Sequence, residues 1–199
     1  MSATEVAELP PCCNNCPSPV GSRWIASASD TWGWCGVRIV EQDEVRGYLL
    51  LAPAADPPED GPYATTPVSD DVAVVAKVWV DSEFRRVGMG RQLVQGAAAL
   101  AHRAGVPALE VIGSYGPGTC TVPAVSWLRR TGFEVTRNHP LHPRLRLDLS
   151  RTVRWPRFSH AFDRLTHLVR PASPPEPAGR QPRNSDPEPA GAGAGTWHG

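Results

Sequence analysis

Residues 73–105, AVVAKVWVDSEFRRVGMGRQLVQGAAALAHRAG, decide the fold because the hydrophobic period changes once along them. Residues 72–80 are a run of apolar, largely β-branched side chains, which is typical of a strand buried on both faces. In residues 91–104 apolar side chains recur at helical spacing, and Gly105 stands where a C-terminal glycine cap belongs. The stretch therefore predicts a strand, a turn and a helix in that order.

Two arginines and two glycines lie at the predicted turn, in the segment RRVGMG at residues 85–90. The N-terminus of a helix offers unpaired backbone N–H groups and about half a positive charge. Residues without a Cβ atom let a large anion approach that backbone closely. The segment therefore predicts a pyrophosphate site, although a tight turn with solvated arginines stays open as the simpler interpretation.

Three phosphate-binding patterns can be compared with this segment. A Walker loop is excluded because Gly90 is followed by Arg91 and not by lysine. A dinucleotide-binding fingerprint is a weak alternative, because it needs a small residue where Leu93 stands. The third pattern, Arg/Gln-x-x-Gly-x-Gly/Ala, is satisfied by Arg85, Gly88 and Gly90. In this pattern the sequence resembles the Gcn5-related N-acetyltransferases, the GNAT superfamily.

The resemblance continues downstream of the glycines. The segment ALEVI at residues 108–112 is similar to the next strand of the family, and residues 124–134 resemble its second signature, a short helix that ends in Gly-Phe. The match covers residues 36–150. It implies an α/β (α+β) protein with the GNAT-type acyl-CoA N-acyltransferase fold, in which helices flank a mixed central sheet and the central parallel strands splay apart.

The resemblance also implies acetyl-CoA as the cosubstrate. At the end of the first strand, Trp79 and Val80 would present backbone groups to the pantetheine arm, and the glycine-containing loop would hold the pyrophosphate. The cofactor-binding residues expected in this way are Trp79, Val80, Arg85, Arg86, Val87, Gly88, Met89, Gly90 and Arg91.

Acetyl transfer to an amine needs a group that removes a proton from the amine, because a free lysine amine has a pKa of about 10.4. Glu110 is the candidate base: an acidic residue in an apolar strand is costly unless exposed or used. It matches the base-bearing Leu-Glu-Val strand of the ribosomal-protein N-acetyltransferase branch. Solvent exposure or pairing with an arginine is the alternative. The family's usual tyrosine acid is replaced by Leu128, so Tyr115 is the candidate acid, with Cys120 or a water as alternatives.

The function predicted from these residues is transfer of an acetyl group from acetyl-CoA to a primary amine by direct attack. The acceptor, a small molecule or a protein, cannot be derived from the sequence. Two alternatives stay open: a non-catalytic acyl-CoA-binding or sensor protein, and a cysteine-centred zinc or redox interaction protein.

Three of the five cysteines fall in CCNNC at residues 12–16, and this region resembles an actinobacterial branch of the superfamily with an N-terminal CxxC. Cys13 and Cys16 have the spacing of half a zinc site, and Cys35 and Cys120 could complete it only if the fold brings them together. Because a second CxxC is absent, the pattern does not favour a metal site. Zinc binding and redox use of the pair stay open.

The chain has 199 residues, with 20 basic and 20 acidic side chains, so no net field indicates nucleic acid or an anionic membrane as a partner. The beginning of the sequence lacks signal-peptide features, and we expect a cytoplasmic protein. The expected parts are an abbreviated Cys/Trp segment at 1–35, the GNAT domain at 36–150, an amphipathic helix at 151–170 and a disordered tail at 171–199. The helix could pack on the domain or support a homodimer.

Overall fold

The strand expected at residues 72–80 lies third in a mixed sheet of six strands with the order β1-β2-β3-β4-β6-β5. In this computed structural model, residues 1–13, 16, 18–58 and 63–150 are described. The strands are β1 Gly36–Glu41, β2 Glu44–Pro53, β3 Ala73–Val80, β4 Ala108–Ile112, β5 Glu134–Arg137 and β6 Arg144–Asp148. Only the β3–β4 pair is parallel; the other four pairs are antiparallel.

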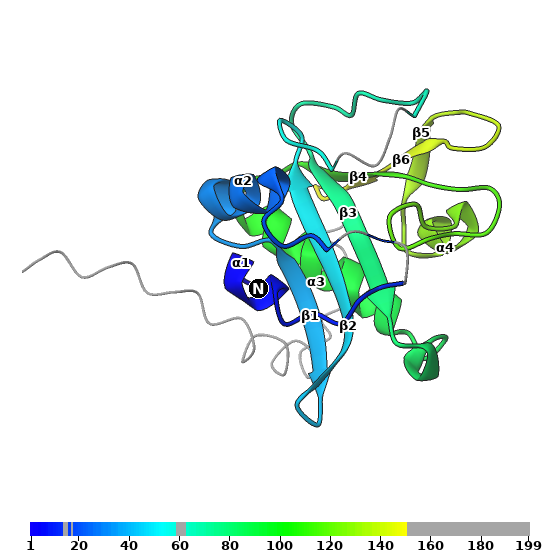
Figure 1. Cartoon of the computed structure of the whole chain (residues 1–199). Helices are drawn as coiled ribbons and strands as arrows, with labels where there is room; N and C mark the ends of the chain where they lie inside the picture. The colour runs from blue at the N-terminus through cyan, green and yellow to red at the C-terminus, as the bar shows by residue number, and fades with distance from the viewer. Residues whose placement is uncertain (14–15, 17, 59–62, 151–199) are drawn as a thin grey trace, which may run out of the picture. The chain divides into compact units, whose positions relative to one another are not determined.

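Helices cover both faces of this sheet. They are α1 Ala3–Val6, α2 Arg23–Trp32, α3 Met89–Arg103 and α4 Val125–Arg130, with a 3-10 turn at Ser82–Phe84. Figure 1 shows α1 and α2 in front of β1–β3 and α3 behind them. The predicted α/β fold with a mixed sheet flanked by helices is therefore confirmed.

Two apolar layers hold the helices to the sheet. On one face Leu93 and Ala97 of α3 are buried against Leu109 of β4, as the helical spacing predicted. On the other face Ile25 of α2 packs in a second cluster with Leu50 of β2. Alternation along the strands supplies both layers, because successive side chains of a strand point to opposite faces.

The central parallel strands separate soon after they meet, as predicted. Their register contains only the pairs Ala73↔Leu109 and Val74↔Glu110, although β3 continues to Val80. The loop between β4 and α4 enters the space that this separation leaves. There the N–H of Val78 donates to the carbonyl oxygen of Cys120 at 2.7 Å. A backbone donor beyond the divergence of the strands is therefore already paired within the chain.

The connection between β2 and β3 contains prolines at positions 57, 58, 62 and 67, so its composition predicts a long exposed loop. Thr65 is buried, and its hydroxyl donates to the carbonyl oxygen of His142 at 3.0 Å. Prolines exclude regular hydrogen-bonded structure, but they do not prevent packing on a neighbouring element. In its described part the connection forms no helix or strand, as predicted, and only Thr65 among its described residues, 54–58 and 63–71, is buried, while Ser69 bonds Glu110 of β4.

Other sequence predictions lie outside the described residues, namely the C-terminal helix at 151–170 and the tail at 171–199. The sequence from Trp24 to Asp30 predicts a short helical piece, which the structure contains within α2, whereas α1 was not predicted. No helix among the described residues combines the length and the hydrophobicity that a bilayer crossing demands.

Candidate functional site

The turn between β3 and α3 has the backbone conformation that its glycines favour. Gly88 is the N-cap of α3 with φ 94°, in the left-handed region, and its carbonyl oxygen accepts from the N–H groups of Arg91 at 3.0 Å and Gln92 at 3.1 Å. The N–H groups of Met89 and Gly90 lie in the first turn, where a helix provides no acceptor of its own. The start of α3 therefore presents backbone donors and the positive end of the helix dipole.

A cavity of about 980 Å³ opens beside this turn. Four arginines line it, Arg85, Arg86, Arg91 and Arg130, and among its described lining residues there is no carboxylate. Arginine presents a fork of donors that matches phosphate oxygens. The cavity is thus suited to a multiply charged anion.

Contacts within the cavity wall orient the arginines. The Nε of Arg85 donates to the carbonyl oxygen of Val80 at 3.2 Å, and a guanidinium nitrogen of Arg91 donates to the carbonyl oxygen of Arg130 at 2.9 Å. The indole of Trp127 lies so close to Gly90 that a Cβ atom there would come within 3.2 Å of the ring. Any larger residue at position 90 would therefore push against Trp127.

Seven of the nine residues expected to bind the cofactor line this cavity. They are Trp79, Val80, Arg85, Arg86, Gly88, Gly90 and Arg91. The side chain of Val87 is 69% exposed, and the sulfur of Met89 faces Gly47 of β2. These two residues could contribute only their backbone groups to a ligand.

Three further lining residues, Trp127, Arg130 and Thr131, were missed by the sequence analysis. They come from α4 and the residue after it, in the helix that carries the Gly-Phe signature. Their spacing of three and four residues places them on one helix face, and this signal could have identified them.

Three cysteines also line the arginine-rich cavity. Cys12, Cys13 and Cys120 line the cavity, and burial raises the pKa of the neighbouring Cys16 thiol to about 11. Cys35 lies elsewhere, buried with its thiol directed at the carbonyl oxygen of Ile25 at 3.5 Å. Of the two cysteines expected as partners for the CxxC pair, the fold brings only Cys120 to it.

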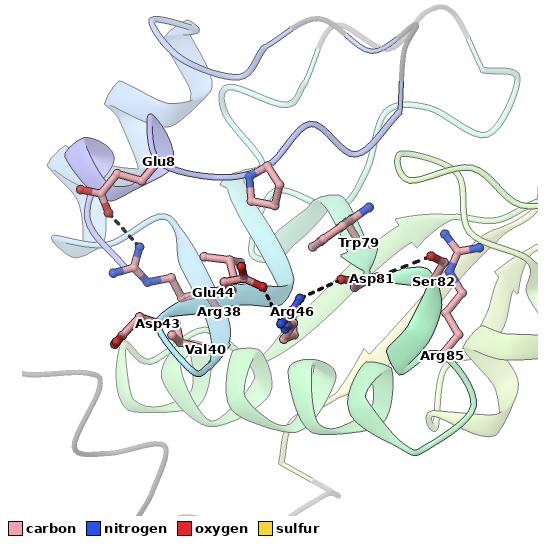
Figure 2. A pocket seen from close by; sticks show the side chains of 12 residues that line it. Glu8, Arg38, Val40, Asp43, Glu44, Arg46, Trp79, Asp81, Ser82 and Arg85 are labelled. Carbon is pink, nitrogen blue, oxygen red and sulfur yellow. Dashed lines mark hydrogen bonds and ion pairs between the residues drawn. The ribbon is translucent and has the colours of Figure 1, made fainter.

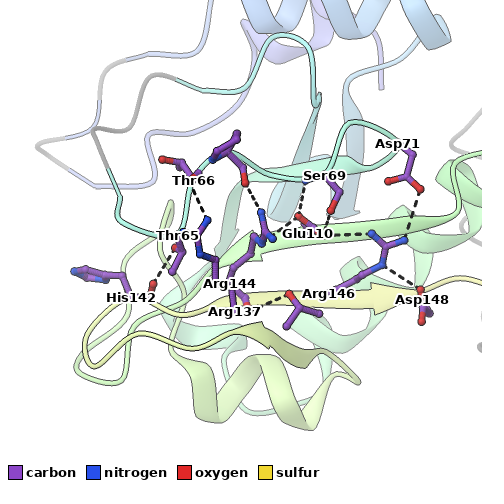
Figure 3. Close-up of polar contacts among 12 residues, drawn as sticks. Thr65, Thr66, Ser69, Asp71, Glu110, Arg137, His142, Arg144, Arg146 and Asp148 are labelled. Atoms are coloured by element: carbon purple, nitrogen blue, oxygen red, sulfur yellow. Dashed lines mark hydrogen bonds and ion pairs between the residues drawn. The ribbon is translucent and has the colours of Figure 1, made fainter.

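Glu110 is buried on β4, and its carboxylate is fully engaged (Figure 3). One oxygen accepts from the Ser69 hydroxyl at 2.8 Å and from Arg146 at 3.3 Å. The other accepts from the Ser69 N–H at 3.1 Å and lies 3.6 Å from the Nε of Arg144. This is the pairing with arginine that the sequence analysis kept as the alternative to a catalytic role.

Two arginines, Arg144 and Arg137, hold the β2–β3 connection over Glu110. Arg144 donates to the carbonyl oxygen of Pro67, and Arg137 donates to that of Thr66 at 3.2 Å. Figure 3 shows these side chains rising from β5 and β6 toward the connection. Solvent and ligands reach Glu110 only if this covering segment moves, because Glu110 is 1% exposed.

Tyr115 lies on the loop after β4 with its side chain 48% exposed. Its hydroxyl donates to Asn138 at 3.4 Å, near the turn between β5 and β6. Among the described residues that line the arginine-rich cavity, neither Tyr115 nor Glu110 occurs. The structure therefore does not bring the two catalytic candidates to the anion site.

A second cavity, of about 840 Å³, lies on the side of α1 and shares Trp79 and Arg85 with the first (Figure 2). Its charges are largely paired with one another. Arg38 bonds Glu8 at 3.2 Å, and Arg46 bridges Glu44 and Asp81. Three arginines and four carboxylates line this cavity, so it lacks the positive excess of the arginine-rich one.

Comparison with known proteins places this geometry in a family. The profile described as acetyltransferase (GNAT) family matches residues 4–133, which is most of the chain. The chain belongs to the GNAT family. The match begins well before residue 36, so the N-terminal segment that the sequence analysis set apart is largely included. None of the curated proteins compared with the chain matches it.

Solved structures give weaker similarities. The PaiA N-acetyltransferase of Thermoplasma acidophilum, in complex with coenzyme A, is 10% identical with a TM-score of 0.45, over 62% of this chain and 66% of that protein. A structure described as an acetyltransferase is 17% identical with a TM-score of 0.45, over 62% and 76%. A GNAT-family acetyltransferase of Staphylococcus aureus Mu50 is 11% identical with a TM-score of 0.40, over 56% and 64%.

Proposed function

We propose that the chain is an acetyl-CoA-dependent N-acetyltransferase that acts on a primary amine. The observation that carries this proposal is the arginine-lined cavity at the N-terminus of α3, beside the divergence of β3 and β4. A pyrophosphate needs unpaired N–H donors and cationic forks together, and this cavity offers both. Membership of the GNAT family supports acetyl-CoA as the source of that pyrophosphate.

In the proposed complex the diphosphate accepts from the N–H groups of Val87 to Gly90 and from the guanidinium groups around them, including that of Arg91. The pantetheine arm extends along Trp79 and Val80 toward the gap between the central strands. The amine nitrogen attacks the thioester carbon, a new C–N bond forms and the C–S bond breaks. The amine loses one proton, and the CoA thiolate that leaves takes up one proton, so the products are an amide and the free thiol of CoA.

Glu110 is proposed as the base, and Tyr115 as the acid that protonates the departing thiolate. Both roles require movement, because Ser69, Arg144 and Arg146 engage the Glu110 carboxylate and the Tyr115 hydroxyl is held by Asn138. Displacement of the β2–β3 connection by an acceptor would expose Glu110.

A second candidate function is binding of acyl-CoA without turnover, and two contacts favour it. The carbonyl oxygen of Cys120 occupies the N–H of Val78, a donor that an extended pantetheine arm could use. Each oxygen of the Glu110 carboxylate already accepts a hydrogen bond from Ser69, and Glu110 is 1% exposed. Under this interpretation the protein would bind CoA and never release thiol from acetyl-CoA with any amine.

Substitution of Gly88 by aspartate tests the cofactor site. In Gly88→Asp a carboxylate would stand at the N-cap of α3, at the proposed anion site, so we expect CoA affinity to fall at least about a hundredfold. Isothermal titration calorimetry with CoA measures this loss.

The matched control is Gly33→Asp. Gly33 also has a positive φ, 75°, and also borders open space, but it ends α2 away from the cavity. The variant therefore also adds one negative charge at a position with positive φ, and CoA affinity should stay at the wild-type value. Equal CoA binding by both variants and the wild type would refute the placement of the diphosphate.

A further inference from the structure

Four cysteine thiols converge on one wall of the arginine-rich cavity. The Sγ atoms of Cys12, Cys13, Cys16 and Cys120 all lie within 4.8 Å of one another. The Sγ of Cys120 is 2.9 Å from that of Cys12 and 3.0 Å from that of Cys16. These separations are longer than a disulfide bond of about 2.05 Å, and none of the cysteines is disulfide-bonded.

The spread of these distances fits one metal ion. Zinc–sulfur bonds of about 2.3 Å in a tetrahedron place the sulfur atoms about 3.8 Å apart. The two Sγ separations of 2.9 and 3.0 Å are shorter than that value, and all separations among the four thiols lie within 4.8 Å, so a small adjustment of the side chains would place them around one ion. A cluster of several iron atoms would hold its cysteines further apart, because irons and sulfides stand between them.

Both arms that carry the thiols are fixed to the sheet by other contacts. The N-terminal segment is held where the Tyr48 hydroxyl of β2 donates to the carbonyl oxygen of Pro10 at 3.2 Å. The β4–α4 loop is held where Val78 of β3 donates to the carbonyl oxygen of Cys120 at 2.7 Å. These two hydrogen bonds thus bring together cysteines that are 104 to 108 residues apart in the sequence. Such a preformed arrangement lowers the entropy cost of binding an ion.

The ligand type selects the metal. In the part of the chain that the structure describes, this group holds thiols only, without carboxylate or histidine. Hard cations such as Mg²⁺ and Ca²⁺ need oxygen ligands, whereas thiolates select zinc and other soft metals. Four protein ligands would also leave no open position on zinc, which is the property of a structural site and not of a catalytic one.

We propose that Cys12, Cys13, Cys16 and Cys120 together bind one Zn²⁺ ion as a closed structural site. Cys13 is exposed and the other three are half-buried, so the ion can enter from solvent. On binding, each thiol gives its proton to solvent and becomes a thiolate ligand, with no change of oxidation state. The site joins the N-terminal segment to the β4–α4 loop, and it does not depend on the proposed acetyl transfer.

Metal analysis of untagged protein, purified without chelator, tests the proposal. We expect about one zinc per chain in the wild type by mass spectrometry of the metals. In Cys16→Ser and Cys120→Ser the zinc content should fall to less than about a tenth, because a serine hydroxyl is a poor zinc ligand. Cys35→Ala is the matched control and should keep the wild-type content, since Cys35 lies in the core under α2.

Cobalt substitution gives a readout of geometry in the wild-type chain, whatever the folding of the variants. Four thiolates around Co²⁺ should give the intense visible bands of a tetrahedral sulfur site, and Zn²⁺ should bleach them at one equivalent. Three results would overturn the proposal. The first is an equal zinc content in Cys16→Ser and the wild type, and the second is iron in place of zinc. The third is a disulfide among these cysteines in protein that binds no cobalt even after the disulfide has been reduced.

Discussion

Glu110 is the residue at which a catalytic role and a structural role make different predictions. Its carboxylate is 1% exposed, accepts hydrogen bonds from Ser69 and Arg146, and forms an ion pair with Arg144 at 3.6 Å. A carboxylate with these partners stabilises the covering connection, and the same carboxylate could take a proton from an amine only after releasing at least one partner. Separate measurements of stability and of turnover can therefore distinguish the two roles.

Replacement of Glu110 by glutamine should affect both quantities if the proposed function is correct. Thiol release from acetyl-CoA, with an amine that wild type uses, should slow about a hundredfold or more, because a positioned base contributes that much. Unfolding free energy should fall by about 2 kcal/mol, because Arg144 and Arg146 lose a buried anionic partner. CoA affinity measured by calorimetry should stay unchanged.

Ser69→Ala is the matched control, because it removes one hydrogen bond to Glu110 and keeps the carboxylate. Its stability should fall by about 1 kcal/mol while its turnover stays near the wild-type rate. If the two variants lose turnover only in proportion to their loss of stability, Glu110 is structural and the base lies elsewhere.

At the scale of the element, the glycine-rich loop at residues 113–124 shapes the cavity wall. Its backbone passes so close to the start of α4 that a Cβ atom on Gly118 would come within 2.3 Å of the Ala124 nitrogen. A bridge between Ser114 and Ala124 holds the two ends of the loop together. These contacts define the path of the loop, which places the carbonyl oxygen of Cys120 beside the N–H of Val78.

Gly118→Ala should disrupt this course. The added methyl group would clash with the backbone nitrogen of Ala124 unless the backbone shifts. We therefore expect a loss of about 1–3 kcal/mol in unfolding free energy. Gly116→Ala is the control, since a Cβ there would meet only the Ser114 hydroxyl at 3.6 Å, and its stability should change by less than about 0.5 kcal/mol. Equal midpoints in urea unfolding would show that the loop is not held as the structure indicates.

Elements with a strong local period were predictable, and elements set by distant contacts were not. The strand at 73–80 and the helix at 89–103 follow from hydrophobic spacing, because β3 is buried on both faces of the sheet and α3 on one face. The covering of Glu110 depends on Ser69, from a segment whose composition only indicates the absence of regular structure. The meeting of Cys120 with the CxxC pair depends on the placement of a loop about a hundred residues away, which no local pattern encodes.

At the scale of the whole molecule, the proposed zinc ion would cross-link parts of the chain that are far apart in sequence. Cys12 and Cys120 are separated by 108 residues, and Cys16 and Cys120 by 104. By the loop-closure relation that describes disulfides, closing a loop of about 100 residues removes about 4.7 kcal/mol of chain entropy from the unfolded state. A metal cross-link acts in the same direction, because its binding free energy adds to the free energy of folding.

Removal of the metal should therefore lower the melting temperature of the entire described domain and not only loosen the N-terminus. With about 4 kcal/mol lost, and about 2–4 °C per kcal/mol for a chain of this size, we expect a fall of about 10 °C or more after treatment with a zinc chelator. Added Zn²⁺ should restore the wild type but not Cys120→Ser, because the variant lacks the ligand that closes the loop. An unchanged melting temperature in protein shown to have lost its zinc would mean that backbone contacts at Val78 and Pro10 suffice, and that the ion does not cross-link the folded chain.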